Sequence, residues 1–134
     1  MKSSNETFEI KSSPETFFVE YLTLKKPIIE VILSQIHKKK VVLNPKLLGV
    51  FALLLYYNHK YKDLDELIRW DLIFSNTTKE EIMKKLKISK MHLNTYLSML
   101  RSLRLLNGNR INDPFIIYPN GGYDLTFKFT FHEK

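Results

Sequence analysis

Apolar residues recur at helical spacing through the middle of the chain and alternate with polar residues near its end. In Pro27–His37 five isoleucine and leucine residues share one helical face, and Pro45–Tyr57 is apolar nearly all round. Asn44-Pro45 is typical of a helix start, because Asn caps free backbone amides and Pro suits the first helical position. The pattern therefore predicts a most-buried helix over Pro45–Tyr57, followed by a shorter helix over Asp63–Asp71.

Two other segments favour β-structure. Thr16–Thr23 is rich in aromatic and β-branched residues. In Tyr123–Phe131 every second residue from Leu125 is large and apolar, which is the period of a half-buried strand. The turn cluster Pro119–Gly122 precedes it, after a short extended segment, Ile116–Tyr118. We therefore expect an N-terminal strand lying near a C-terminal β-hairpin, with residues 1–15 as a flexible polar arm.

The sharpest local signals lie between Thr78 and Arg104. Thr78 and Glu81 have the spacing of a capping box, which predicts a helix starting there. Ser89 can cap the next helix, which runs from Lys90 to about Arg104 and carries its leucines on one face. Two capped helices are thus joined by a three-residue break.

The stretch TTKEEIMKKLKISKMHLNTYLSMLRSLRLL resembles the helix-turn-helix family. The matching positions hold Glu81, Ile82, Leu86, Ile88, Ser89, Leu93, Leu97 and Leu100. Because a basic turn and a predicted hairpin follow, the chain resembles a winged helix-turn-helix. One departure is Lys87, which occupies a turn position often held by Gly. A positive φ there would cost Lys on the order of 1 kcal/mol.

The resemblance implies an α+β fold: a winged helix-turn-helix with an additional N-terminal strand and helix and a C-terminal β-hairpin wing. It implies one domain over residues 16–134, with the helix-turn-helix core at 76–106 and the wing at 107–131. The third helix, from Lys90, would enter the major groove of double-stranded DNA. The implied DNA-binding residues are Lys84, Lys85, Lys87, Lys90, Met91, Asn94, Thr95, Ser98, Arg101 and Arg110.

Charge supports a polyanionic partner for this region. The chain of 134 residues has a formal net charge of +7, and residues 79–110 hold five lysines and three arginines against two glutamates. Because the excess is mostly lysine, phosphate attraction is favoured over base recognition, which relies on arginine for guanine. The alternative is that this face is merely solvated.

Several classes are disfavoured. The chain has no cysteine, its four histidines lack metal-ligand spacing, and no catalytic motif is present. Its longest apolar run, Val50–Tyr57, is far shorter than the roughly 20 residues that cross a bilayer. We therefore expect a cytoplasmic protein that is not an enzyme and uses no metal, cofactor or membrane.

A looser resemblance points elsewhere. The segment Ile111–Pro114 and the terminal aromatic strand are similar to small proteins of crAss-like and other tailed bacteriophages. That resemblance implies a ring or connector subunit of a virion, in which the winged helix packs against protein. A homo-oligomer or a protein partner would then use the C-terminal strand or the N-terminal arm.

Overall fold

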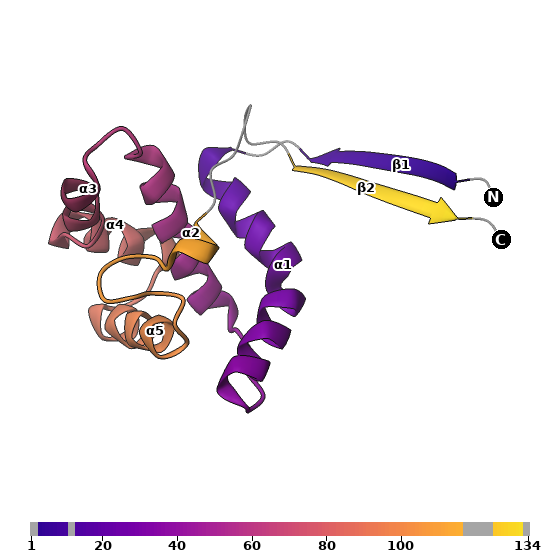
Figure 1. The fold of residues 1–134 in the computed structure, drawn as a ribbon. Helices are drawn as coiled ribbons and strands as arrows, with labels where there is room; N and C mark the ends of the chain where they lie inside the picture. The colour runs from indigo at the N-terminus through magenta and orange to yellow at the C-terminus, as the bar shows by residue number, and fades with distance from the viewer. Residues whose placement is uncertain (1–2, 11–12, 117–124, 133–134) are drawn as a thin grey trace.

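The computed structural model describes residues 3–10, 13–116 and 125–132, with side chains from residue 13 to residue 116. The helices are α1 (Pro14–His37), α2 (Pro45–Lys60), α3 (Glu66–Ile73), α4 (Asn76–Leu86) and α5 (Lys90–Ser102), followed by a single 3₁₀ turn, η1 (Asp113–Phe115). Helix α2 lies at the centre and packs against the other four (Figure 1). The side-chain core of the described residues is therefore built mainly by helices, and the connecting segments add Val41, Leu43, Leu105, Leu106 and Ile111.

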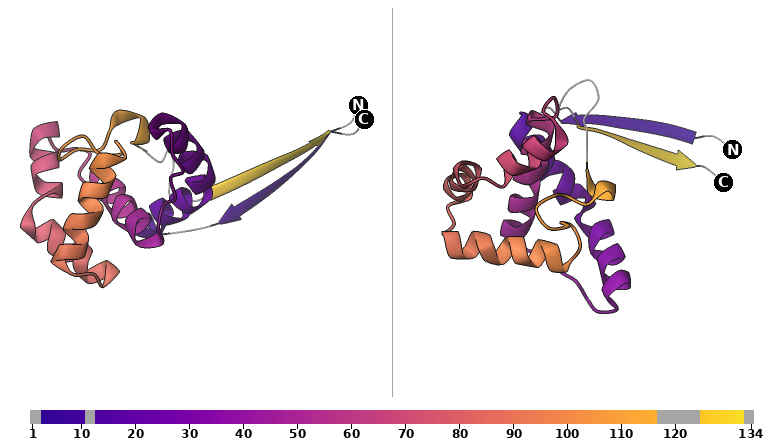
Figure 2. Two further views of the ribbon diagram at one scale, coloured as in Figure 1. Left: turned by 90° about the horizontal axis from the view of Figure 1, so that it is seen from below. Right: turned by 60° about the vertical axis from the view of Figure 1, so that its left-hand side comes forward.

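The expected α+β fold with a C-terminal hairpin wing is wrong. Between residues 13 and 116 the only β-pairing is an isolated bridge from Leu106 to Ile111. Strand β2 (Leu125–His132) pairs antiparallel with β1 (Ser3–Ile10), from the opposite end of the chain. Both strands project together from the helical body (Figures 1 and 2). The ribbon is thus formed by the chain ends and not by a wing that follows α5.

The residues after α5 have a physical reason not to form a wing strand. Gly108 has a φ of +60° in a tight turn, and Asp113–Phe115 forms the 3₁₀ turn. Pro114 has no backbone N–H to donate to a neighbouring strand. Phe115 packs edge-on against Phe51 of α2, with ring centroids 6.4 Å apart. This segment therefore lies on the core, and the turn cluster expected at 119–122 falls outside the described residues.

The N-terminal strand expected at Thr16–Thr23 is also wrong, because these residues belong to α1. Ser13 caps the helix by accepting from the amide of Thr16, and the Thr16 hydroxyl accepts from the Ser13 amide. Aromatic residues favour strands only weakly, and burial on one helical side outweighs that preference. Phe18 and Leu22, four residues apart, are both buried. Pro27, at the start of the segment expected to be helical, lies inside this helix.

The start and the burial expected for the central helix are confirmed. The Asn44 side chain accepts from the amides of Lys46 and Leu47, at 2.8 and 3.1 Å. Most of the side chains of α2 are buried, among them Leu47, Val50, Phe51, Leu54 and Leu55. A helix that is apolar nearly all round is suited to a buried position, and α2 contacts all four of the other helices.

The α4–α5 pair differs from the prediction at one cap and agrees at the other. Helix α4 begins at Asn76, where Ser75 is the N-cap, and the Thr78 hydroxyl instead donates to the carbonyl of Leu72 at 2.8 Å. Ser89 caps α5 by accepting from the amide of His92. Between the helices, Lys87 has a φ of +55°, the left-handed conformation that disfavours a side chain.

Two contacts fix α4 on the central helix. A Cβ on Gly49 would lie 3.1 Å from a terminal methyl of Leu86, so the two helices approach closely at that glycine. The Lys46 ammonium donates to the carbonyl of Leu86 at 2.6 Å and satisfies a free group at the end of α4. These contacts set where α5 lies, because α5 follows α4 after only three residues.

Candidate nucleic-acid interface

The exposed side of α5 forms one wall of a groove. The opposite wall is the connection between α1 and α2, which begins with the Lys38–Lys40 triplet. The groove is shallow and open to solvent, with a volume of about 940 Å³, and is lined by Lys39, Lys40, Val41, Val42, Lys90, Met91, Asn94, Thr95, Ser98, Met99, Ser102 and Leu103. Five of the ten residues predicted to bind DNA, namely Lys90, Met91, Asn94, Thr95 and Ser98, therefore line one surface.

The second wall is held in place by side chains of α1. The amide of Val41 donates to the Ser34 hydroxyl at 2.9 Å, and the amide of Leu43 donates to a Glu30 carboxylate oxygen at 2.7 Å. Val41 and Leu43 are buried, and Val42 between them is exposed. This alternation anchors the connection and leaves Val42 facing the groove.

The ends of α1 and α5 meet beside this wall. The His37 ring donates from Nε2 to the carbonyl of Leu103 at 3.2 Å. The lysine triplet begins at the next residue, where Lys38 has a left-handed φ of 53° and ends α1. The chain therefore turns at once toward the C-terminal end of α5.

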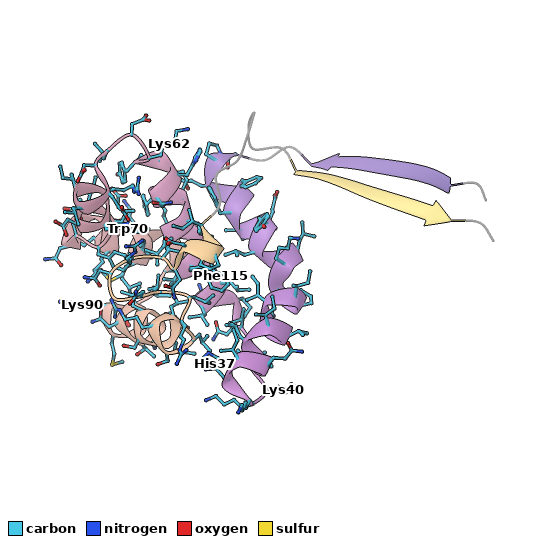
Figure 3. The ribbon with its side chains drawn as sticks, in the orientation of Figure 1. His37, Lys40, Lys62, Trp70, Lys90 and Phe115 are labelled. Atoms are coloured by element: carbon cyan, nitrogen blue, oxygen red, sulfur yellow. The ribbon has the colours of Figure 1, made fainter. Side chains whose placement is uncertain are left out.

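Cations lie at both ends of the groove. Figure 3 shows Lys90 at the start of α5, and His37 and Lys40 beyond the far end of that helix. The 13 residues of α5 correspond to roughly 20 Å at ~1.5 Å per residue. Between the two charged ends the lining is neutral, with amide and hydroxyl groups from Asn94, Thr95 and Ser98.

No carboxylate neutralises these cations within the described side chains. The ion pairs there involve only Lys85 and Arg110. Lys84, Lys87 and Lys90 are exposed, as are Lys39 and Lys40. This face therefore carries uncompensated positive charge, which attracts a polyanion when several phosphates can be reached together.

Three predicted site residues are used within the protein. Lys85 forms an ion pair with Glu15 of α1, and its ammonium lies 5.8 Å from the centroid of the Tyr56 ring. Arg101 donates from Nε to the carbonyl of Gly108 at 3.0 Å and from Nη2 to Asn109 at 2.8 Å. Lys85 is thus directed toward α1 and α2, and Arg101 holds the tight turn that follows α5.

Arg110, expected on a wing, is the third of these residues. Its Nη2 lies 3.0 Å from a carboxylate oxygen of Asp113 and 3.2 Å from one of Glu66 in α3. With two carboxylates around it, Arg110 presents little net positive charge to a second anion. The arrangement brings Lys90 and its neighbours on α5 together but leaves Arg110 outside the groove.

Sequence reasoning missed Lys39 and Lys40 as site residues. The only signal was the lysine triplet itself, which reads as a solvated connector when it is seen alone. Its position is decided by Ser34 and Glu30, more than three residues away in the chain, which draw the connection along α1.

No helix among the described residues is long and apolar enough to cross a membrane. Comparisons of this chain with protein-family models, with curated proteins and with solved structures found no match.

Proposed function

We propose that this protein is a small, non-enzymatic DNA-binding protein, acting in transcription regulation or as an accessory factor in replication. In this proposal the exposed face of α5 lies in the major groove of a DNA duplex. Lys90 contacts phosphates at one end of the helix, and Lys39 and Lys40 contact phosphates at the other. The neutral residues between them face the base edges.

The observation that carries the proposal is the placement of uncompensated cations at both ends of one helical face. The major groove of B-DNA is about 12 Å wide, with a phosphate backbone along each edge. Cations separated by the ~20 Å length of α5 can therefore contact both backbones while the helix lies between them. A merely solvated face has no need of lysines from two distant segments at the two ends of one groove.

The composition of the face indicates modest sequence specificity. Asn94 can pair with adenine through two hydrogen bonds, and Met91 or Thr95 can contact a thymine methyl group. Arginine, which reads guanine best, is absent from the lining described above, because Arg101 bonds to the turn that follows α5. Most of the affinity should therefore come from phosphates. This function places the protein in the cytoplasm, or in the host cytoplasm if a phage encodes it.

The test is fluorescence anisotropy of a labelled duplex, titrated with protein over a series of salt concentrations. The double variant Lys40→Glu/Lys90→Glu should lose binding, and the log–log salt slope of the parent should be about one unit per phosphate contact. The matched control, Lys25→Glu/Lys62→Glu, makes the same charge change on other surfaces and should retain most of the affinity. Absence of duplex binding by the parent at about 50 mM salt would overturn the proposal. So would equal losses in both double variants, because the binding would then depend on total charge alone.

A second candidate function is a structural subunit of a phage virion, favoured by the terminal ribbon. The register pairs Phe8 with Phe127 and Ile10 with Leu125, so the residues of apolar character share one face of a two-stranded sheet. Such a sheet is marginal alone in water and gains stability from further strands or a covering surface. A large ring-shaped assembly in electron micrographs, together with absence of duplex binding, would favour this candidate over the first.

A further inference from the structure

Exposed apolar side chains gather in the groove beside α5, together with its lysines. On α5 the exposed fraction is 71% for Met91 and 39% for Met99, and on the opposite wall it is 63% for Val42. Exposed apolar residues that occur singly are ordinary on protein surfaces, whereas these three line one groove. A phosphate offers an apolar side chain nothing to pack against. The lining therefore fits a ligand that also presents an apolar group.

Thr95 adds a methyl group to this lining. Its hydroxyl donates to the carbonyl of Met91, one turn earlier in α5, at 3.0 Å. The hydroxyl proton is used inside the helix by this bond, so the methyl is the group that Thr95 presents to a base. Met91, Thr95 and Met99 follow one another at intervals of four residues, and all three are exposed. They therefore form a row of apolar groups along one face of the helix.

The polar side chain beside this row suits one base better than the others. Asn94 is exposed next to Thr95 and lines the same groove. An amide can donate to N7 of adenine and accept from its N6 amino group at the same time. Guanine instead presents two acceptors, N7 and O6, which arginine or lysine reads best. The middle of the lining described above holds no cation, because Lys90 and the pair Lys39 and Lys40 lie at its ends.

Thymine supplies the apolar group that the lining fits. It is the base that carries a methyl group, on C5, in the major groove. Apolar side chains packed over guanine would bury its two acceptors without partners, which is unfavourable. The same side chains packed over thymine would bury methyl against methyl. The lining of the groove therefore favours A·T pairs over G·C pairs.

We propose that α5 selects A·T-rich duplexes by packing the side chains of Met91 and Thr95 against thymine methyl groups, with the Asn94 amide on an adenine. The inference rests on the proposed DNA binding and names the class of sequence that this surface prefers. Phosphate contacts set much of the affinity but carry no sequence information, so the preference comes from the row on α5. Each thymine methyl that is buried should strengthen binding about fourfold.

Replacing thymine by uracil tests the inference on the DNA, because it removes the C5 methyl and keeps the base pairs and the phosphates. Fluorescence anisotropy compares an A·T duplex, the same duplex with uracil throughout, and a G·C duplex of equal length. The uracil and G·C duplexes should each bind about fourfold more weakly, or weaker still, with an unchanged log–log salt slope. Equal affinities for the thymine and uracil duplexes would overturn the methyl contact and leave DNA binding standing. Absence of binding to every duplex would overturn the proposed function, and this inference with it.

Matched substitutions test the same contact on the protein. Thr95→Ser removes the methyl and keeps the hydroxyl that bonds to Met91, so the preference for thymine over uracil should fall about fourfold. Thr95→Val keeps a methyl there and should retain the preference. The control Thr23→Ser makes the same change on α1, where the hydroxyl donates to the carbonyl of Val19 in the same way, and should leave the preference unchanged.

Circular dichroism of each variant checks that the helices are kept. An unchanged preference in Thr95→Ser, or an equal loss in Thr23→Ser, would overturn the proposal.

Discussion

The phenol of Tyr57 in α2 donates a hydrogen bond of 2.9 Å to a carboxylate oxygen of Glu81 in α4. The Tyr57 side chain is buried, and burial together with the hydrogen bond and charge of Glu81 raises the pKa of its phenol. Glu81 was expected to complete a capping box with Thr78, but it instead joins the α4–α5 pair to the central helix.

Removing this hydrogen bond should destabilise the protein without changing its fold. Tyr57→Phe deletes only the hydroxyl, so we expect the free energy of unfolding to fall by about 1–2 kcal/mol. Urea titration followed by circular dichroism measures the change. Tyr56→Phe, on the adjacent half-buried residue, is the control and should have little effect. Equal losses in the two variants would show that the bond to Glu81 adds no stability.

Lys87 should be a place where glycine is better than the native residue. Its φ of +55° is strained for a side chain and is free of strain for glycine. We therefore expect Lys87→Gly to raise the free energy of unfolding by up to about 1 kcal/mol. Lys84→Gly, inside α4, should lower it by about the same amount, because glycine is a poor helix former. Thermal unfolding of both variants checks the opposite signs.

Arg101 should matter more for stability than for DNA affinity. Its two hydrogen bonds to Gly108 and Asn109 hold the turn after α5, so Arg101→Ala should cost about 1 kcal/mol in urea titration. In the anisotropy titration its loss of duplex affinity should be smaller than that of Lys90→Ala. A larger loss of affinity than Lys90→Ala, with stability unchanged, would assign Arg101 to the interface.

Stability should fall in mild acid because of His59. Burial, and then the positive charge of Lys62, lowers the pKa of this histidine from its ordinary 6.5. Below pH 6.5 the unfolded chain therefore binds a proton that the native protein resists, so the unfolded state gains stability. The contribution of His59 to the free energy of unfolding should be fully present above about pH 7. It should fall below pH 6.5, by at most about 1.4 kcal/mol per pH unit.

The measurement is urea unfolding at a series of pH values between about 5 and 8. His59→Gln should flatten the profile, because its side chain does not titrate. His92→Gln replaces an exposed histidine and should retain the fall. A fall of the same size in His59→Gln would assign the acid sensitivity to other groups.

Local signals in the sequence determined the start of α2 and much of the α4–α5 pair, but not the first half of α1. Asn44 and Ser89 have the side chains that cap free amides, and both act as caps. The stripe Leu93–Leu97–Leu100 is buried on one side of α5, as its spacing predicts. Capping and helical periodicity act within one or two turns, so these features can be read without knowledge of the rest of the chain. The sequence also shows that Lys87 occupies a turn position often held by Gly, and the residue there has a positive φ.

Only the tertiary structure decided which segments meet. Residues 125–132 form a strand, β2, and its partner is β1, because strand pairing depends on which backbone edge is available and not on local pattern. Phe18 and Leu22 belong to a helix because α2 offers an apolar surface that a helical side covers. The resemblance implies a DNA-binding role for Arg110, yet its guanidinium lies 3.2 Å from a carboxylate oxygen of Glu66 in α3. Lys40 was read as part of a connector, yet it lines a groove with α5. Charge and composition were evident in the chain from the start. The long-range contacts that place each charge beside an acid or leave it uncompensated arise only when the helices pack.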